Sequence, residues 1–268
     1  MTRAERPERT VAALLASSLR DREWWDALEA DDAGVERREE AARRAAALYR
    51  ATAPLIPPRL EVDEAEPFDH AIGCLREIAD TWAMRSIAWT DEERDALGVP
   101  THRAIQLFVR LHDVDAWARG MGYALDLGDP NIPEEVWSDR REESDVSPAD
   151  LARRCVDALA TYEQVLGLRE SEEGRELLQS EDFRRATCSE IAQGRAWVVW
   201  TRGHLASEVE PVALVMLAVA QGSFLLGCTP DDKAEVFPTL EYLRMLLAKT
   251  DANDWLLEQG AELPDWLG

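Results

Sequence analysis

Helical spacing of apolar residues is the feature that most restricts the fold of this chain. Between residues 68 and 89, a line of mostly apolar side chains recurs at alternating intervals of three and four: Ile72, Leu75, Ala79, Trp82, Ser86 and Trp89. These intervals place the side chains on one face of an α-helix. The alternation that is typical of strands is hard to find in the sequence. The pattern predicts an all-α fold, a multi-helix bundle of about 8–10 helices.

Helix start signals agree with this spacing in several places. Ser147 is followed by Pro148 and by an acid at Asp150, a combination typical of a helix N-terminus, and the segment from Thr229 repeats it. We expect helices at residues 8–29, 33–52, 68–89 and 101–119, another from 147 onward, and further helices at 181–203, 209–226, 230–249 and 251–259. The first two are expected to form an N-terminal helical hairpin.

A proline-rich and acidic segment divides the sequence. Pro54, Pro57 and Pro58 precede an acidic stretch that ends at Pro67, and no helix can cross these prolines intact. Residues 54–67 are therefore the predicted linker between an N-terminal hairpin at 1–53 and a main helical domain at 68–268. One continuous domain is the alternative.

Charge limits the classes of partner. The chain has 53 Asp and Glu against 30 Lys and Arg, a formal net charge of −23, which argues against binding bare nucleic acid or an anionic membrane. We expect a non-catalytic interaction or regulatory protein, such as an adaptor, an inhibitor or an immunity-like protein. Its expected partner is a basic protein, bound less tightly as salt rises. No cofactor is predicted for this function.

The expected location is the cytoplasm. The N-terminal residues contain no uninterrupted apolar region of the kind found in secretion signals. The four cysteines are widely spaced, which is typical of buried free thiols. The most apolar stretch, from Pro211 to Cys228, is interrupted by Gln221, Gly222 and Ser223, so we interpret it as a buried central helix.

A mixed polar and aromatic stripe on the expected 181–203 helix is the leading candidate site. Its members recur at intervals of three and four: Glu190, Gln193, Trp197, Trp200 and His204. An acid, an amide, two indoles and an imidazole on one face can line a ligand pocket or anchor a partner protein. A small-molecule-binding helical sensor is therefore one alternative function. Core packing with polar groups at its margin is the structural alternative.

A second pattern concerns metal chemistry. His70, the dipeptide His112-Asp113 and a later aspartate such as Asp157 follow the order H…HD…D. In residues 68–160 this order resembles the HD-domain metal-dependent phosphohydrolases, which are all-helical. The resemblance implies a divalent metal held by these four residues and an activated water that attacks phosphorus. Asp145 and Asp150 are other candidates for the fourth ligand.

The sequence departs from the HD family after the HD dipeptide. Asp115, Ala116 and Trp117 stand where that family usually has a small residue and a lysine. A looser pattern, Glu61-x-x-Glu64 followed by Glu77-x-x-Asp80, is similar to the magnesium motif of MazG-type nucleotide pyrophosphohydrolases. In a chain this acidic, a solvated acidic segment explains the same residues. These two patterns define the enzymatic alternative, and the sequence assigns no catalytic residue beyond them.

Overall fold

A computed structural model describes residues 7–29, 34–55, 66–87, 102–128, 147–204, 209–228 and 238–267. Within these ranges the chain forms twelve α-helices and one short 3-10 helix, and it forms no strand. The predicted all-α fold is confirmed. The chain divides into two compact units, residues 1–140 and 141–268. We describe each unit by itself.

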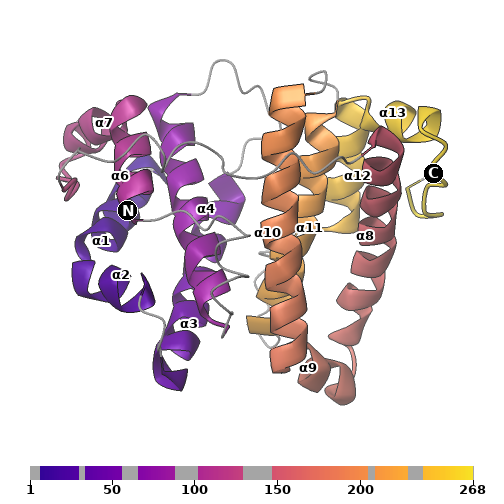
Figure 1. The fold of residues 1–268 in the computed structure, drawn as a ribbon, viewed down its shortest axis with the longest axis horizontal. Helices are drawn as coiled ribbons and strands as arrows, with labels where there is room; N and C mark the ends of the chain where they lie inside the picture. Colours follow the sequence, from indigo (N-terminus) through magenta and orange to yellow (C-terminus); the bar gives the residue numbers. More distant parts are fainter. Residues whose placement is uncertain are drawn as a thin grey trace, which may run out of the picture. The chain divides into compact units, whose positions relative to one another are not determined.

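The first unit is built around helix α4, Pro67–Arg85. Helices α1 (Pro7–Arg20), α3 (Val35–Thr52), α6 (His102–Leu111) and α7 (Val114–Gly120) all pack against it. The short helix α2 (Arg22–Glu29) belongs to the same unit (Figure 1), and so does the 3-10 helix η1 (Ala53–Leu55). Among the α4 residues that are buried in the core are Ala71, Leu75, Ile78 and Ala79. The apolar line predicted at residues 72–82 is therefore the centre of this core.

Aromatic side chains hold the α1–α2 corner against α6. Trp25 is 1% exposed, and its indole N–H donates to the Ser18 carbonyl at 2.8 Å. The Trp25 ring stacks on His102 with centroids 5.0 Å apart, and His102 Nε2 lies 3.0 Å from the Leu19 carbonyl oxygen. A carbonyl oxygen only accepts hydrogen bonds, so Nε2 carries the proton in this contact.

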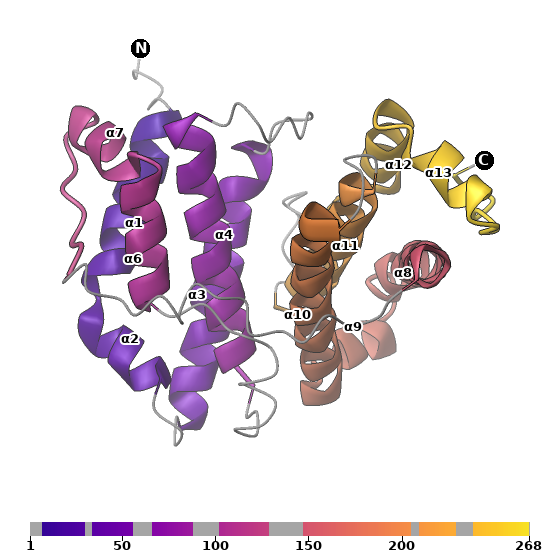
Figure 2. The same ribbon diagram turned by 45° about the horizontal axis from the view of Figure 1, so that its top comes forward.

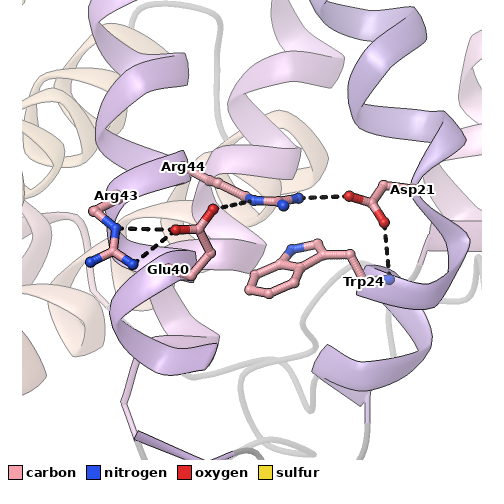
Figure 3. A network of polar contacts seen from close by, with 5 residues as sticks. All are labelled: Asp21, Trp24, Glu40, Arg43 and Arg44. Carbon is pink, nitrogen blue, oxygen red and sulfur yellow. Dashed lines mark hydrogen bonds and ion pairs between the residues drawn. The ribbon is translucent and has the colours of Figure 1, made fainter. Parts of the chain in front are cut away.

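A charged network joins the same corner to α3 (Figure 3). Arg44 donates from Nε to Glu40 and from a terminal nitrogen to Asp21, both at 2.9 Å. Its guanidinium carbon lies 4.1 Å from the centroid of the Trp24 ring. Arg43 adds two further hydrogen bonds to Glu40. Hydrogen bonds from Arg44 first, and from Arg43 second, lower the pKa of the Glu40 carboxyl.

The second unit is built around helix α11, Glu210–Cys228. Helices α8 (Pro148–Leu168), α9 (Glu172–Gln179), α10 (Glu181–His204) and α12 (Leu240–Lys249) pack against α11, and α13 (Ala252–Glu258) packs against α12. Figure 2 shows α10 and α11 side by side, with α8 beside α11. By length and composition α11 resembles a membrane span, but 67% of its most apolar window is buried inside the protein. It has the place expected of a buried central helix.

Several helices end earlier than the spacing predicted. The expected 8–29 helix breaks at Asp21 into α1 and α2, and the expected 101–119 helix breaks after Leu111 into α6 and α7. Helix α9 was not predicted, and α12 begins at Leu240, where the Tyr242 N–H donates to the Thr239 hydroxyl. The predicted start of that helix near residue 230 lies outside the described residues. Periodicity continues across such breaks, so it cannot locate them.

The structure describes the helices on both sides of the expected linker. Residues 56–65 lie outside the described residues, but the helices on both sides of them belong to the first unit. Helix α3 packs extensively against α4, and Tyr49 of α3 donates a hydrogen bond to the buried carboxylate of Asp80 on α4. The 54–67 segment therefore connects two helices of one core, and the division between the compact units falls at residues 140 and 141.

Candidate functional site

A cleft of about 260 Å³ opens in the second unit between α8, α10 and α11. We call it the α8–α11 cleft. Its polar lining residues are Arg154, Asp157 and Thr161 from α8, Thr187, Glu190 and Gln193 from α10, and Ser223 from α11. Apolar side chains from the same helices, including Val165, Phe183, Met216 and Val219, complete the lining.

The sequence of α8 explains how its polar residues reach the cleft. The helix begins where the Asp150 N–H donates to the hydroxyl of the N-cap residue Ser147 at 3.1 Å. From that start, the buried residues Leu151, Cys155 and Leu159 share one face. Arg154, Asp157 and Thr161 recur at intervals of three and four beside this face, which brings all three side chains to the cleft.

Close helix packing forms the base of the cleft. A Cβ added to Gly194 on α10 would lie 3.1 Å from the Leu217 Cα on α11, so the two backbones approach closely. A Cβ added to Gly222 on α11 would lie 2.5 Å from the Tyr162 hydroxyl of α8. That hydroxyl donates to the Pro238 carbonyl at 3.0 Å. Glycine at these two positions allows the three helices to meet beneath the polar rim.

The three charged groups of the cleft have no ion-pair partner in the part of the chain that the structure describes. Arg154, Asp157 and Glu190 all retain contact with solvent. Arg154 instead lies over the ring of Trp197, with its guanidinium carbon 5.6 Å from the ring centroid. Desolvation raises the pKa of the Glu190 carboxyl. A partly desolvated acid without a counter-charge is a common feature of binding sites.

Ser223 supplies a buried polar group in the same cleft. Its side chain is only 4% exposed and lines the cleft from α11. A serine hydroxyl can both donate and accept a hydrogen bond, so Ser223 offers a donor and an acceptor to a molecule in the cleft.

The predicted stripe on α10 is placed in part. Glu190 and Gln193 line the cleft, while Trp197 is buried at 4% exposure and contacts the cleft through Arg154. The side chains of Trp200 and His204 lie outside the described part of the structure. The contribution of α8 was missed. Its polar residues repeat the same interval, so a search for polar stripes on every expected helix would have found them.

The structure describes the proposed HD ligands in two different compact units. His70 and His112 do meet, with ring centroids 4.0 Å apart and an interplanar angle of 24°, and Phe108 packs against both. Nitrogen lone pairs lie in the ring planes, so stacked rings direct them side by side rather than toward one ion. Asp113 adopts a left-handed conformation between α6 and α7. Asp157 belongs to the second unit, where it lines the α8–α11 cleft.

The described residues contain no group of three or more His, Cys, Asp or Glu placed to hold a metal ion. Within the first unit, His70, His112 and Asp113 therefore do not form such a group by themselves. Of the MazG-like pattern, Glu61 and Glu64 lie outside the described residues. Asp80 is 1% exposed and accepts the hydrogen bond from Tyr49.

Comparisons of the chain with protein-family models, with curated proteins and with solved structures give no match.

Proposed function

We propose that this protein is a non-catalytic regulatory protein that holds a basic partner at the α8–α11 cleft. The observation that carries the proposal is the pair of acids without ion-pair partners at this cleft, Asp157 and Glu190, from two different helices. A cationic side chain from a partner would supply the counter-charge that no described residue provides. The apolar lining would take up the hydrocarbon part of that side chain.

The charge of the whole chain supports the same class of partner. A net charge of −23 attracts basic molecules over distances of about one Debye length, about 8 Å at physiological ionic strength. Attraction of this kind raises the rate of encounter, whereas specificity depends on groups at the contact itself. The two contributions are separable by mutation, because most of the acidic side chains lie outside the cleft.

A peptide titration tests this function. The probe is a decapeptide of alternating glycine and arginine that ends in arginine with a free carboxylate, and its citrulline counterpart is the uncharged control. We expect the arginine peptide to bind the full chain more tightly than the citrulline peptide, with an affinity that falls as salt rises. The double variant Asp157→Asn, Glu190→Gln is expected to weaken binding at least about tenfold, since it removes both counter-charges.

The matched control is the double variant Glu173→Gln, Glu176→Gln. It removes the same charge from exposed positions on α9, outside the cleft. We expect this variant to weaken binding less than threefold, through long-range attraction alone. Equal losses in the two double variants would assign binding to general charge and would contradict a site at the cleft. Equal binding of the arginine and citrulline peptides would overturn the proposed function.

Binding of a small molecule is the second candidate, and the contact between Arg154 and Trp197 at the cleft favours it. The volume of about 260 Å³ lies just below the range of about 300–1,000 Å³ that is typical of ligand pockets, so the molecule would be small. Trp197 lies against Arg154 and would report a ligand that displaces this guanidinium. The test is the change in tryptophan fluorescence on adding free arginine. A change that disappears in Trp197→Phe supports the candidate, and an unaltered spectrum at saturating arginine contradicts it.

A further inference from the structure

The α8–α11 cleft contains both signs of charge. Arg154 supplies one cation, and Asp157 and Glu190 supply two acids. A ligand that satisfies all three groups has an anion at one point and cationic groups elsewhere. Simple amines satisfy only the acids, and simple carboxylates satisfy only Arg154. A basic amino-acid unit with a free α-carboxylate satisfies both.

We propose that the α8–α11 cleft recognises a basic amino-acid unit with a free α-carboxylate. Arg154 pairs with the carboxylate, and Asp157 and Glu190 face the cationic side chain. This inference rests on the proposed function and specifies the chemistry of the bound group. Two sources share that chemistry, a free basic amino acid and the C-terminal residue of a peptide.

A comparison of two arginine–aspartate pairs on α8 supports a ligand role for Arg154. Arg153 and Asp150 are three residues apart on this helix, and they form an ion pair at 2.5 Å. Arg154 and Asp157 have the same separation in the opposite order and form none in the described structure. The Arg154 guanidinium lies over Trp197 instead. An arginine held by an aromatic face keeps its N–H donors available for a carboxylate, which it can bind through two parallel hydrogen bonds.

The base of the cleft fits the rest of such a ligand. Met216 and Val219 provide apolar surface for a hydrocarbon stem, and Ser223, which is 4% exposed, provides a hydroxyl in the same cleft. Glu190, Asp157 and Ser223 come from three different helices, so acceptor groups from all three helices line the cleft. A guanidinium has five N–H donors in a planar fork and is weakly hydrated, so it suits this arrangement better than an ammonium.

Calorimetric titration of the full chain tests the inference with the same arginine decapeptide. The free-acid peptide is compared with its C-terminal amide, and Arg154→Gln is compared with Arg153→Gln. Arg153 is the adjacent exposed residue and lies outside the cleft, so its variant is the matched control. We expect amidation to weaken binding at least about tenfold in the wild type. We expect Arg154→Gln to cause the same loss for the free acid and to abolish the difference between the two peptides. Arg153→Gln should leave both affinities within about twofold.

Two further measurements complete the test. Ser223→Ala is expected to weaken the free-acid peptide about threefold while thermal unfolding stays cooperative. Free arginine, added as a competitor, identifies the source: displacement of the peptide at similar concentrations indicates a free amino acid, and weak displacement indicates a peptide terminus. Equal binding of acid and amide peptides would overturn the inference and leave the proposed function intact. Failure of the arginine peptide to exceed the citrulline peptide would overturn the proposed function itself.

Discussion

Arg44 shows how one residue stabilises the first unit. Its guanidinium pairs with Glu40 and Asp21 and lies over Trp24 (Figure 3). A lysine keeps the charge but loses the planar fork and the stacking surface. We predict that Arg44→Lys lowers the free energy of unfolding by about 1–2 kcal/mol, measured by urea denaturation. Arg43→Lys is the control because Arg43 is more exposed and, among the described residues, forms an ion pair with Glu40 alone, and it should cost less than about 0.5 kcal/mol. Equal effects would contradict a special role for Arg44.

The contributions of Glu190 and Glu40 to stability should change in opposite directions as pH rises. Desolvation raises the pKa of Glu190 above its ordinary value of 4.5, so the folded state holds this proton more tightly. Wild-type protein should therefore lose stability relative to Glu190→Gln as pH rises from 4.5 through the raised pKa. Arginine hydrogen bonds lower the pKa of Glu40, so its contribution is present above 4.5 and is lost as pH falls through the lowered pKa. For each glutamate we compare the free energy of unfolding of the wild type with that of its glutamine variant, measured by urea denaturation at pH 7 and at acidic pH. We expect this difference to change by about 0.5–1 kcal/mol between the two pH values, since both side chains contact solvent. Differences of the same sign would contradict both assignments.

At the scale of helices, apolar spacing located most of the elements and missed their ends. The spacing shows which residues face a core, but a helix ends where side chains compete for backbone groups. Asp21 illustrates this, because its carboxylate accepts from the Trp24 N–H at 3.2 Å and α2 begins at the next residue, Arg22. Asp113 likewise separates α6 from α7 within the single helix that the spacing predicted at residues 101–119. To predict these two breaks, one would have to identify Asp21 and Asp113 as turn residues among the many aspartates of the chain. Apolar spacing alone does not distinguish them.

Asp113 provides the test at this scale, because its φ of 53° lies in the left-handed region. Glycine adopts this conformation without strain, whereas for alanine it is unfavourable by about 1 kcal/mol. We predict that Asp113→Gly unfolds within about 0.5 kcal/mol of the wild type and that Asp113→Ala is about 1 kcal/mol less stable than the glycine variant. Asp251, with a φ of 54°, should show the same order between α12 and α13. Equal destabilisation by glycine and alanine would instead indicate a role for the Asp113 carboxylate.

For the whole molecule, the candidate site could be only half predicted because it joins separate helices. The α10 stripe was visible in one segment, and it supplied Glu190 and Gln193. Asp157 was also singled out, but as a metal ligand with His70 and His112. No local pattern shows that α8 and α10 both pack against α11, because tertiary packing decides which polar stripes line one cleft. Net charge suggests a basic partner, which stays a prediction, and it cannot place such a partner on the surface.

The two compact units give the last prediction. Fragments 1–140 and 141–268 each contain the described packing of one central helix, α4 or α11, so we expect each to unfold cooperatively when expressed alone. Fragment 141–268 retains every residue of the cleft and should bind the arginine peptide within about threefold of the full chain.

Fragment 1–53 separates Tyr49 and the apolar face of α3 from α4, and helices of this length are marginal without packing. Circular dichroism should therefore show 1–53 to be largely unfolded. A cooperative melt of 1–53 would support the domain boundary predicted at 54–67, and loss of peptide binding by a folded 141–268 would show that the cleft depends on the first unit.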